Sequence, residues 1–348
     1  PRMWFLASFM VVFGAHFSAI WITAANSWMQ TPAGYALQEE PLPVRAVMTD
    51  FWETVFTPSF VTRLLHVFFA SWTAGAALMA SVGAWYILRK PQFAGLGKAC
   101  LAISLPAFIV FSVANGFIFG PESARSVAEN QPTKLAAMEG IYETEESAPA
   151  YLFGWVDEGS GETIGLAVPG LLSFLSGQDV VTGISDFEVP PTVINLTFQA
   201  YHLMVGLGMA IIPFALLAAG LWFWKRKLLD HRWALWIVVS SVFVSLFIIT
   251  MGWWVAELGR QPWIVYELML TSDAASPVVE AWESVGALAG FVLIYILLLV
   301  LFMYLLNRKI QRGPASLEEV ESKPVDALPD TLRGIFAARG RGEGGMTK

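Results

Sequence analysis

The sequence predicts an all-α membrane protein: a bundle of about six transmembrane helices with one long loop outside the membrane. Of its 348 residues, 56% are hydrophobic and only 14% are charged, and the mean hydropathy is +0.58. Soluble domains carry about 25% charged residues, so a soluble class is excluded. Open strands cannot satisfy their backbone groups in lipid, so the spanning segments should be helices. A span needs about 20 apolar residues, and the runs that meet this length are 3–27, 61–88, 98–120, 193–224, 233–257 and 281–306.

The distribution of basic residues predicts how these spans are oriented. Lysine and arginine cluster in the connections 89–98 and 225–232 and again after residue 306, whereas the alternate connections are acidic or poor in basic residues. Cytoplasmic loops carry the excess of lysine and arginine in membrane proteins, so the basic connections should be cytoplasmic, together with the C-terminus. The predicted extracytoplasmic loops are 28–60, 121–192 and 258–280.

Two segments outside the predicted spans differ from the other connections in length or composition. The connection 121–192 is acidic and far longer than an ordinary loop, and loops of this length are usually functional or disordered. We expect a short helix at 134–139 and turns around 157–162 within it. The segment 313–348 is charged and rich in Gly and Pro, which predicts a disordered cytoplasmic tail and leaves 1–312 as the helical bundle.

Composition also limits the cofactors and partners. The single cysteine, Cys100, allows neither an internal disulfide nor the Cys-x-x-Cys-His attachment of a c-type haem. Any haem must therefore be held by histidine, methionine or a carboxylate. The basic clusters are better explained as cytoplasmic anchors than as a nucleic-acid-binding surface.

Three residues near the outer ends of predicted spans could carry chemistry. His66 and Met204 each lie among small residues, and Glu257 ends the fifth span. Each has an ordinary alternative: a packed histidine, a methionine that fills the core, or a carboxylate at the interface. A carboxylate at membrane depth usually has a partner, and Arg260 could pair with it or bind a haem propionate. A His–Met pair on one side of the membrane suits a low-spin electron-transfer haem; His16, in mid-span, is either a ligand or a hydrogen-bonded packing residue.

Several strings of the sequence, in the same order, resemble subunit I of the cytochrome bd quinol oxidases. The resemblance covers nearly all of the chain up to about residue 312, and chance agreement over so many motifs is not credible. The matching strings are Ser18–Ile22, Ala25–Gln30, His66 with Gly83–Tyr86, Thr133–Glu139, Met204 and Gly252–Trp263, the last of which contains Gly-Arg-Gln-Pro-Trp.

The resemblance implies that the chain binds haem through specific residues. His66 and Met204 would be the axial ligands of a low-spin haem b. Glu257 would be a ligand of a high-spin haem b, with Arg260 beside it. Trp253 would lie between the two haems on the electron path.

The resemblance also implies a quinol site and a proton route. Lys134 and Glu139 match the quinol-site pair of the family's extracytoplasmic Q loop, which here looks like the short type. Ser18 and Asn26 match positions on the proton route. Quinol would be oxidised at the outer face, and electrons would pass through the haems to reduce oxygen to water, separating charge without pumping.

Two departures from the family modify these expectations. The family has about nine spans, and about three of them precede the first span seen here. They carry the histidine ligand of the oxygen-site haem, which is haem d or a third haem b, so we expect an N-terminally truncated subunit I that does not reduce oxygen as given. His202 stands where some members have an arginine near the low-spin haem. A neutral histidine there would favour the oxidised haem and lower its potential.

As a quinol:oxygen oxidoreductase subunit, the chain would lie in the bacterial cytoplasmic (inner) membrane. Its partners would be oxidase subunit II, a small accessory subunit, quinol and oxygen, with ubiquinol and menaquinol both open as substrates. A non-oxidase haem b protein that passes electrons from quinol to a partner would use the same ligand positions. A transporter that binds its substrate through Glu257 and Arg260 would call for an internal repeat, and none is evident in the sequence.

Overall fold

The computed structural model describes residues 2–38, 40, 44–224, 227–276 and 278–314. The chain divides into two compact units, Pro1–Val278 and Val279–Lys348. Six helices in the described part are long and apolar enough to cross a membrane, which confirms the predicted helical membrane fold. The predicted tail, 313–348, lies almost wholly outside the described residues.

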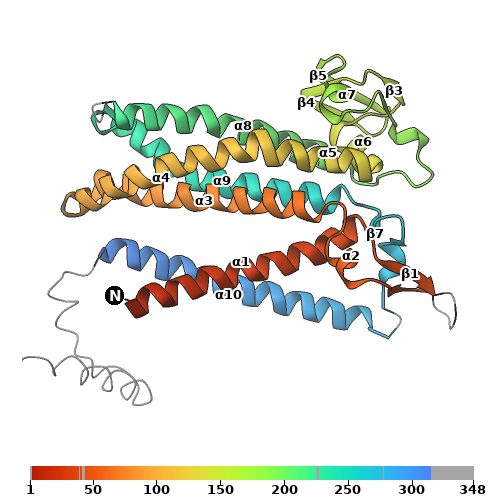
Figure 1. Cartoon of the computed structure of the whole chain (residues 1–348), viewed down its shortest axis with the longest axis horizontal. Coiled ribbons are helices and arrows are strands. Elements are labelled where there is room, and N and C mark those ends of the chain that lie inside the picture. The colour runs from red at the N-terminus through yellow and green to blue at the C-terminus, as the bar shows by residue number, and fades with distance from the viewer. Residues whose placement is uncertain (1, 39, 41–43, 225–226, 277, 315–348) are drawn as a thin grey trace, which may run out of the picture. The chain divides into compact units, whose positions relative to one another are not determined.

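The first unit contains five of the six long segments, and successive ones run in opposite directions (Figure 1). Helix α3 packs against α4 and α9, α9 packs against α8, and α1 packs against α3. The predicted boundaries agree with most of these helices to within a few residues. The helices are α1 (Arg2–Gln30), α3 (Phe60–Arg89), α4 (Ala94–Ala114), α8 (Ile194–Phe223) and α9 (Arg232–Leu258).

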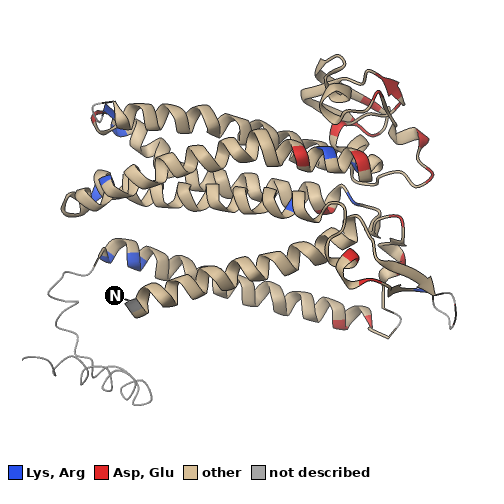
Figure 2. Ribbon diagram, viewed as in Figure 1, with Lys and Arg blue, Asp and Glu red and all other residues tan. Residues whose placement is uncertain are grey.

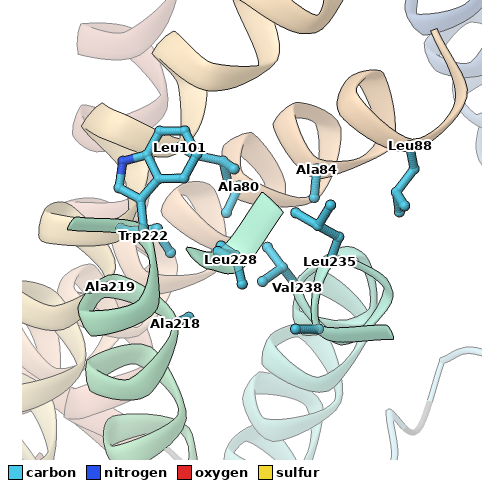
Figure 3. Packing of buried hydrophobic residues seen from close by; sticks show 12 residues of the cluster. Ala80, Ala84, Leu88, Leu101, Ala218, Ala219, Trp222, Leu228, Leu235 and Val238 are labelled. Carbon is cyan, nitrogen blue, oxygen red and sulfur yellow. The ribbon is translucent and has the colours of Figure 1, made fainter. Parts of the chain in front are cut away.

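Small residues let these helices approach closely. In the largest buried cluster, Trp222 of α8 and Leu101 of α4 pack with Leu228, which lies in the 3-10 turn η4 (Lys227–Asp230) (Figure 3). Ala80 and Ala84 of α3 belong to the same cluster, and both are almost fully buried. Small side chains of this kind are what allow transmembrane helices to gain van der Waals contact in a lipid environment.

The third span is longer than predicted. The sequence predicts 98–120, whereas the helical segment runs over Pro91–Asn130. It begins with the 3-10 turn η1 (Pro91–Phe93), and α4 continues through the π-helical turn η2 (Asn115–Phe119) into α5 (Gly120–Asn130). The last part is polar, so hydropathy does not detect it, and Pro121 lies in the first turn of α5.

The connection 121–192 forms a small folded region. The predicted helix at 134–139 is confirmed as α6 (Pro132–Glu139), but the strands were not predicted. Strands β4 (Ala150–Asp157) and β5 (Glu162–Val168) pair as an antiparallel hairpin whose turn falls in the stretch predicted to be turn-rich. Its apolar residues point to both faces, and it therefore lacks the alternation by which a strand is recognised. The remaining elements are β3 (Glu145–Glu146), α7 (Leu171–Ser176), β6 (Val180–Val181) and η3 (Ile184–Asp186).

The two shorter connections at the same end of the unit also contain small hairpins. The first has β1 (Tyr35–Gln38), β2 (Arg45–Met48) and α2 (Phe51–Val55), and the second has β7 (Trp263–Val265), β8 (Met269–Leu270) and η5 (Ser272–Ala274). The backbone N–H of Tyr266 donates to the carbonyl of Met29 at 3.0 Å. This bond ties the turn after α9 to the end of α1.

The second unit contains one long described helix, α10 (Ala281–Arg312). Glu280 and Glu283 form a capping box at its start, which satisfies backbone N–H groups that a helix end leaves without partners. The helix is apolar along its length and has no buried residue among those described, as expected for a surface that faces lipid or another protein.

Candidate functional site

Most of the predicted site residues gather at one end of the first unit, which we call the loop end because the connection 121–192 lies there (Figure 1). Helices α1 and α9 end at this level, and α3 and α8 begin there. At a rise of about 1.5 Å per residue, His66 and Met204 lie within about three turns of the starts of their helices. Figure 2 shows that acidic residues gather at the loop end, where only a few basic residues are found.

Glu257 is held by a chain of hydrogen bonds that crosses three helices. Asn26 Nδ2 of α1 donates to Glu257 Oε1 at 2.8 Å, and Arg260 Nη2 donates to Glu257 Oε2 at 2.7 Å. Arg63 Nη2 of α3 donates in turn to Asn26 Oδ1. The sequence-based pairing of Glu257 with Arg260 is therefore present in the structure, and Asn26 joins it from a distant part of the chain.

Arg260 is much more buried than its partner. Its side chain is 3% exposed, whereas that of Glu257 is 41% exposed. Burial lowers the pKa of Arg260, and the Glu257 carboxylate opposes this shift. Arg260 Nε and Nη1 and Arg63 Nη1 are buried and have no hydrogen-bond partner within the described part of the chain. Buried donors nearly always have partners, so this cluster has capacity for an anionic group.

Lys134 enters the same region from helix α6. Its Nζ donates to Gln30 Oε1 at 3.0 Å and to the Ala256 carbonyl at 3.2 Å. Gln30 Nε2 donates to the same carbonyl at 2.9 Å, and Gln131 Nε2 donates to Gln30 Oε1 at 2.8 Å. The ends of α1, α6 and α9 are thus joined around the fully buried side chain of Gln30.

The two charged residues of α6 have strongly shifted pKa values. Burial is the main cause that lowers the pKa of Lys134 well below its usual value; Arg63 and Arg260 add to the shift, while Glu257 opposes it. Burial raises the pKa of Glu139 to about 7 and outweighs the opposing hydrogen bond with Tyr201. A carboxyl group with a pKa of about 7 can exchange protons near neutral pH, so Glu139 is suited to act as a base.

A glycine fixes the end of α6 directly after Glu139. Gly140 has φ 67°, in the left-handed region that favours glycine. A Cβ at this position would lie 2.7 Å from Thr163 Oγ1 of the hairpin. Thr163 Oγ1 also donates to the Gly140 carbonyl at 2.6 Å, so the hairpin holds the end of the helix that carries Glu139.

His66 lies against the π-helical turn. A Cβ at Gly120 would lie 3.8 Å from His66 Cε1, and Asn115 of the π turn interacts with the imidazole. His66 Nδ1 and Asn115 Oδ1 are buried without a hydrogen-bond partner within the described ranges. Single π turns inside α-helices often occur at functional sites. Within the described residues, His66 Nδ1 is therefore left for a further partner.

Met204 of α8 lies against α9. A Cβ at Gly252 would approach Met204 Sδ to 3.0 Å, so a larger residue there would displace the thioether. Met204 also packs against the buried cluster that includes Met138 of α6 and Val255 of α9. Trp253, the residue after Gly252, is 36% exposed.

His202 lies one turn from Phe198 and faces the hairpin. Its two ring nitrogens lie 2.8 Å from the Phe198 carbonyl and 2.7 Å from the Tyr151 carbonyl. Beside it, a cavity of about 420 Å³ opens between the hairpin and α8, with mostly apolar walls and Gln199 as a further polar residue. The structure thus gives His202 one backbone partner in the hairpin and one in its own helix.

The residues at the loop end fit bound haem. An imidazole nitrogen without a partner, a methionine sulfur and a carboxylate are the donors that hold haem iron. The guanidinium N–H groups of Arg63 and Arg260 match the carboxylates of propionates. A Cβ at Gly206 or Gly208, close to Met204 on α8, would meet no atom within 4 Å.

Two sequence candidates are not part of this cluster. Ser18 is exposed and lies on α1 about 12 Å from the level of Asn26, by the rise of an α-helix. His16 accepts a hydrogen bond from Trp72 Nε1 at 2.9 Å, and its Nδ1 lies 2.8 Å from the Val12 carbonyl. Both ring nitrogens of His16 therefore have partners within the described residues.

Three residues of the cluster were not identified from the sequence: Gln30, Arg63 and Asn115. Gln30 ends one of the recognised strings, so its position in the string was a usable signal. Arg63 lies one turn before His66 near the start of its helix, and a buried arginine there resembles a charge that snorkels to the interface. Asn115 lies beside His66 because of the π turn, and such a turn leaves no recognisable pattern in the sequence.

Comparison with known proteins identifies the same family along nearly the whole chain. The family model for cytochrome bd terminal oxidase subunit I matches residues 1–314. A cytochrome bd ubiquinol oxidase subunit 1 of Bacillus subtilis is 31% identical over 93% of this chain and 71% of that protein. The cytochrome bd-II ubiquinol oxidase subunit 1 of Escherichia coli is 26% identical over 90% of this chain and 74% of that protein. The solved bd oxidase of Geobacillus thermodenitrificans matches with a TM-score of 0.77 and 30% identity, over 87% of this chain and 69% of that one.

Proposed function

Because this chain belongs to the cytochrome bd terminal oxidase subunit I family, we propose that it oxidises quinol at the loop end and passes the electrons through bound haems toward the oxygen site of the oxidase. The family acts as a quinol:oxygen oxidoreductase and binds haem. The observation that carries the proposal for this chain is the buried cluster around Glu257, Arg260, Lys134 and His66. It combines ligand atoms for iron with a lysine that can donate to a quinol oxygen, and Glu139 of the same helix α6 can accept a proton.

Lys134 and Glu139 form the proposed quinol site. Quinol loses two protons when it is oxidised, so a base must lie near its hydroxyl groups. The Glu139 carboxylate accepts the two protons in turn at Oε2 and releases the first to the outer water before the second leaves the quinol; Oε2 has no other partner among the described residues. Lys134 donates a hydrogen bond to the second oxygen.

His66 and Met204 would hold a low-spin haem b, and Glu257 a high-spin haem b. When bound, these groups supply the one-electron chemistry that amino-acid side chains lack. Arg260, with Arg63 beside it, would neutralise propionates, and Trp253 would lie between the two haems. His202 would leave the low-spin haem with less nearby positive charge than an arginine would. No residue of this chain is assigned to the oxygen-site haem, which would be a haem d or a third haem b.

The remaining assignments follow from the family and from charge. We assign the loop end to the extracytoplasmic side, because the basic connections lie at the other end of the unit. Asn26, which is bonded to Glu257, and Ser18 would belong to a proton route along α1. Subunit II of the oxidase is the expected partner in the membrane, and 313–348 would be a cytoplasmic tail.

A reduced-minus-oxidised visible spectrum tests the haem assignment. We expect a low-spin b-type band in the full-length protein, produced with its partner subunits in native membranes, and loss of that band in both His66→Ala and Met204→Ala. The matched controls are His231→Ala and Met209→Ala, which change an exposed histidine and another methionine of α8. Retention of the band in either ligand variant would refute the assignment. Quinol-dependent oxygen uptake is also compared with quinol-dependent reduction of an added electron acceptor. An oxidase takes up oxygen, whereas a quinol-linked haem protein without oxygen chemistry reduces only the added acceptor.

A further inference from the structure

Gln30 has no assigned role, yet its side chain lies at the centre of the hydrogen bonds that hold Lys134. It is fully buried, and both of its amide atoms are used. Its Nε2 donates to the Ala256 carbonyl, and its Oε1 accepts from Gln131 and from Lys134. We propose that Gln30 is a positioning residue, which sets the direction of the Lys134 ammonium group toward bound quinol.

The argument depends on how many donors an ammonium group has. Lysine offers three N–H donors and no acceptor. Gln30 Oε1 and the Ala256 carbonyl take two of them, at 3.0 and 3.2 Å. Two fixed acceptors fix the position and rotation of the Lys134 ammonium group, so its third N–H points in one direction, which we assign to a quinol oxygen. Without Gln30, the ammonium group is held only by its hydrogen bond to the Ala256 carbonyl and can turn about that bond.

Gln30 is suited to this task because its own amide is fixed. An amide that donates to Ala256 with its nitrogen must present its oxygen on the opposite side, where Lys134 and Gln131 lie. The acceptor for Lys134 is therefore oriented by the last turn of α9, next to Glu257. The inference rests on the proposed quinol site at Lys134, and it adds a physical connection between that site and the turn that carries the proposed haem ligand.

Kinetics of quinol oxidation in native membranes that contain the full oxidase test the inference. Gln30→Met keeps the size of the side chain and removes both polar atoms. Gln30→Glu keeps an acceptor for Lys134. Gln178→Met is the control, because Gln178 donates to the Ala128 carbonyl in the same loop and does not contact Lys134. Haem content is read from the visible spectrum of each sample.

We expect Gln30→Met to raise KM for quinol about tenfold, the size of a lost hydrogen bond to a charged group, with an unchanged haem spectrum. The control should keep KM within about twofold of the unaltered protein, whereas Gln30→Glu, which keeps the acceptor for Lys134 but loses the donor to the Ala256 carbonyl, should raise KM less than Gln30→Met does. If Gln30→Met does not assemble, Gln30→Asn replaces it, because the shorter amide does not reach Lys134. An unchanged KM in the assembled variant, or equal loss of haem in Gln30→Met and Gln30→Glu, would overturn the inference. Lys134→Met with normal quinol oxidation would instead overturn the proposed quinol site.

Discussion

Glu139 provides a sharp test of the proposed quinol chemistry, because its pKa is raised to about 7 by burial. As a general base it acts only when ionised. About one tenth of the carboxyl group is ionised at pH 6 and about nine tenths at pH 8 if the pKa is about 7. We therefore expect kcat/KM for quinol to rise about tenfold over this range. In Glu139→Gln the rise should disappear, and the rate at pH 8 should fall by at least about 100-fold, the lower end for loss of a general base.

The control for this prediction is Glu143→Gln, which removes an exposed carboxylate of the same loop. It should retain both the rate and the pH profile. Steady-state quinol oxidation in membranes, at several pH values and with haem content measured for each sample, provides the assay. If Glu139→Gln keeps the pH profile of the unaltered protein, another group accepts the proton and the assignment of the base is wrong.

The same carboxyl group also links stability to pH. The folded protein holds Glu139 with a pKa of about 7, above the ordinary 4.5, so the folded state binds the proton more tightly than the unfolded state. Stability is therefore lost as pH rises through this window, at a cost of about 3 kcal/mol once the carboxylate has formed. An amide carries no charge at any of these pH values. Glu139→Gln should thus gain thermal stability relative to the unaltered protein between pH 5 and pH 8, and a constant difference in Tm would contradict the raised pKa.

Three further predictions concern the haem end and the orientation. Arg260→Gln should lower the midpoint potential of the high-spin haem, because a nearby positive charge favours the reduced form; a spectroelectrochemical titration that shows no change would contradict the proposed position of that haem. Asn26→Leu should cost about 1.5–3 kcal/mol in thermal stability, because it removes a neutral partner from both Glu257 and Arg63; an unchanged Tm would mean that the two bonds contribute nothing. A cysteine in place of Glu162, at the exposed hairpin turn, should react with an impermeant thiol reagent in right-side-out vesicles while Cys100 does not; the reverse pattern would invert the assigned orientation.

The helical framework could be predicted because hydropathy alone determines where a chain enters lipid. The long spans agree with the helices, and the short helix at Pro132–Glu139 was also predicted. The third span was predicted too short because its continuation is polar. The β4–β5 hairpin was missed because its apolar residues do not alternate: Leu152 and Phe153, which are adjacent, are both exposed. Alternation of apolar and polar residues identifies a strand that buries one face in a core. This hairpin has apolar side chains on both faces, so the alternation is missing.

The candidate site was predictable in its motif residues but not in the residues that hold them. Glu257 and Arg260 lie within one string, so their pairing could be inferred from spacing on a helix. Asn26 and Arg63 reach them from other helices, and contacts of this kind depend on how α1, α3 and α9 pack. One sequence contains no record of that packing. The same limit applies to Gln30, whose importance follows from the atoms it contacts rather than from its residue type.

The charge of the loop end supports a redox cofactor over a transported substrate. Arg63, Lys134 and Arg260 carry potential positive charges in one buried region, and Glu257 is the carboxylate that interacts with all three. Burial of like charges is costly unless anions compensate them. A transported substrate leaves in every cycle, and the excess positive charge of the cluster would then be left without a compensating anion each time. The propionates of resident haems are carboxylates that stay in place, so they would stabilise the cluster throughout turnover. Arg63 and Arg260 have buried N–H groups that lack partners within the described part of the chain, and these groups would bind the propionates directly.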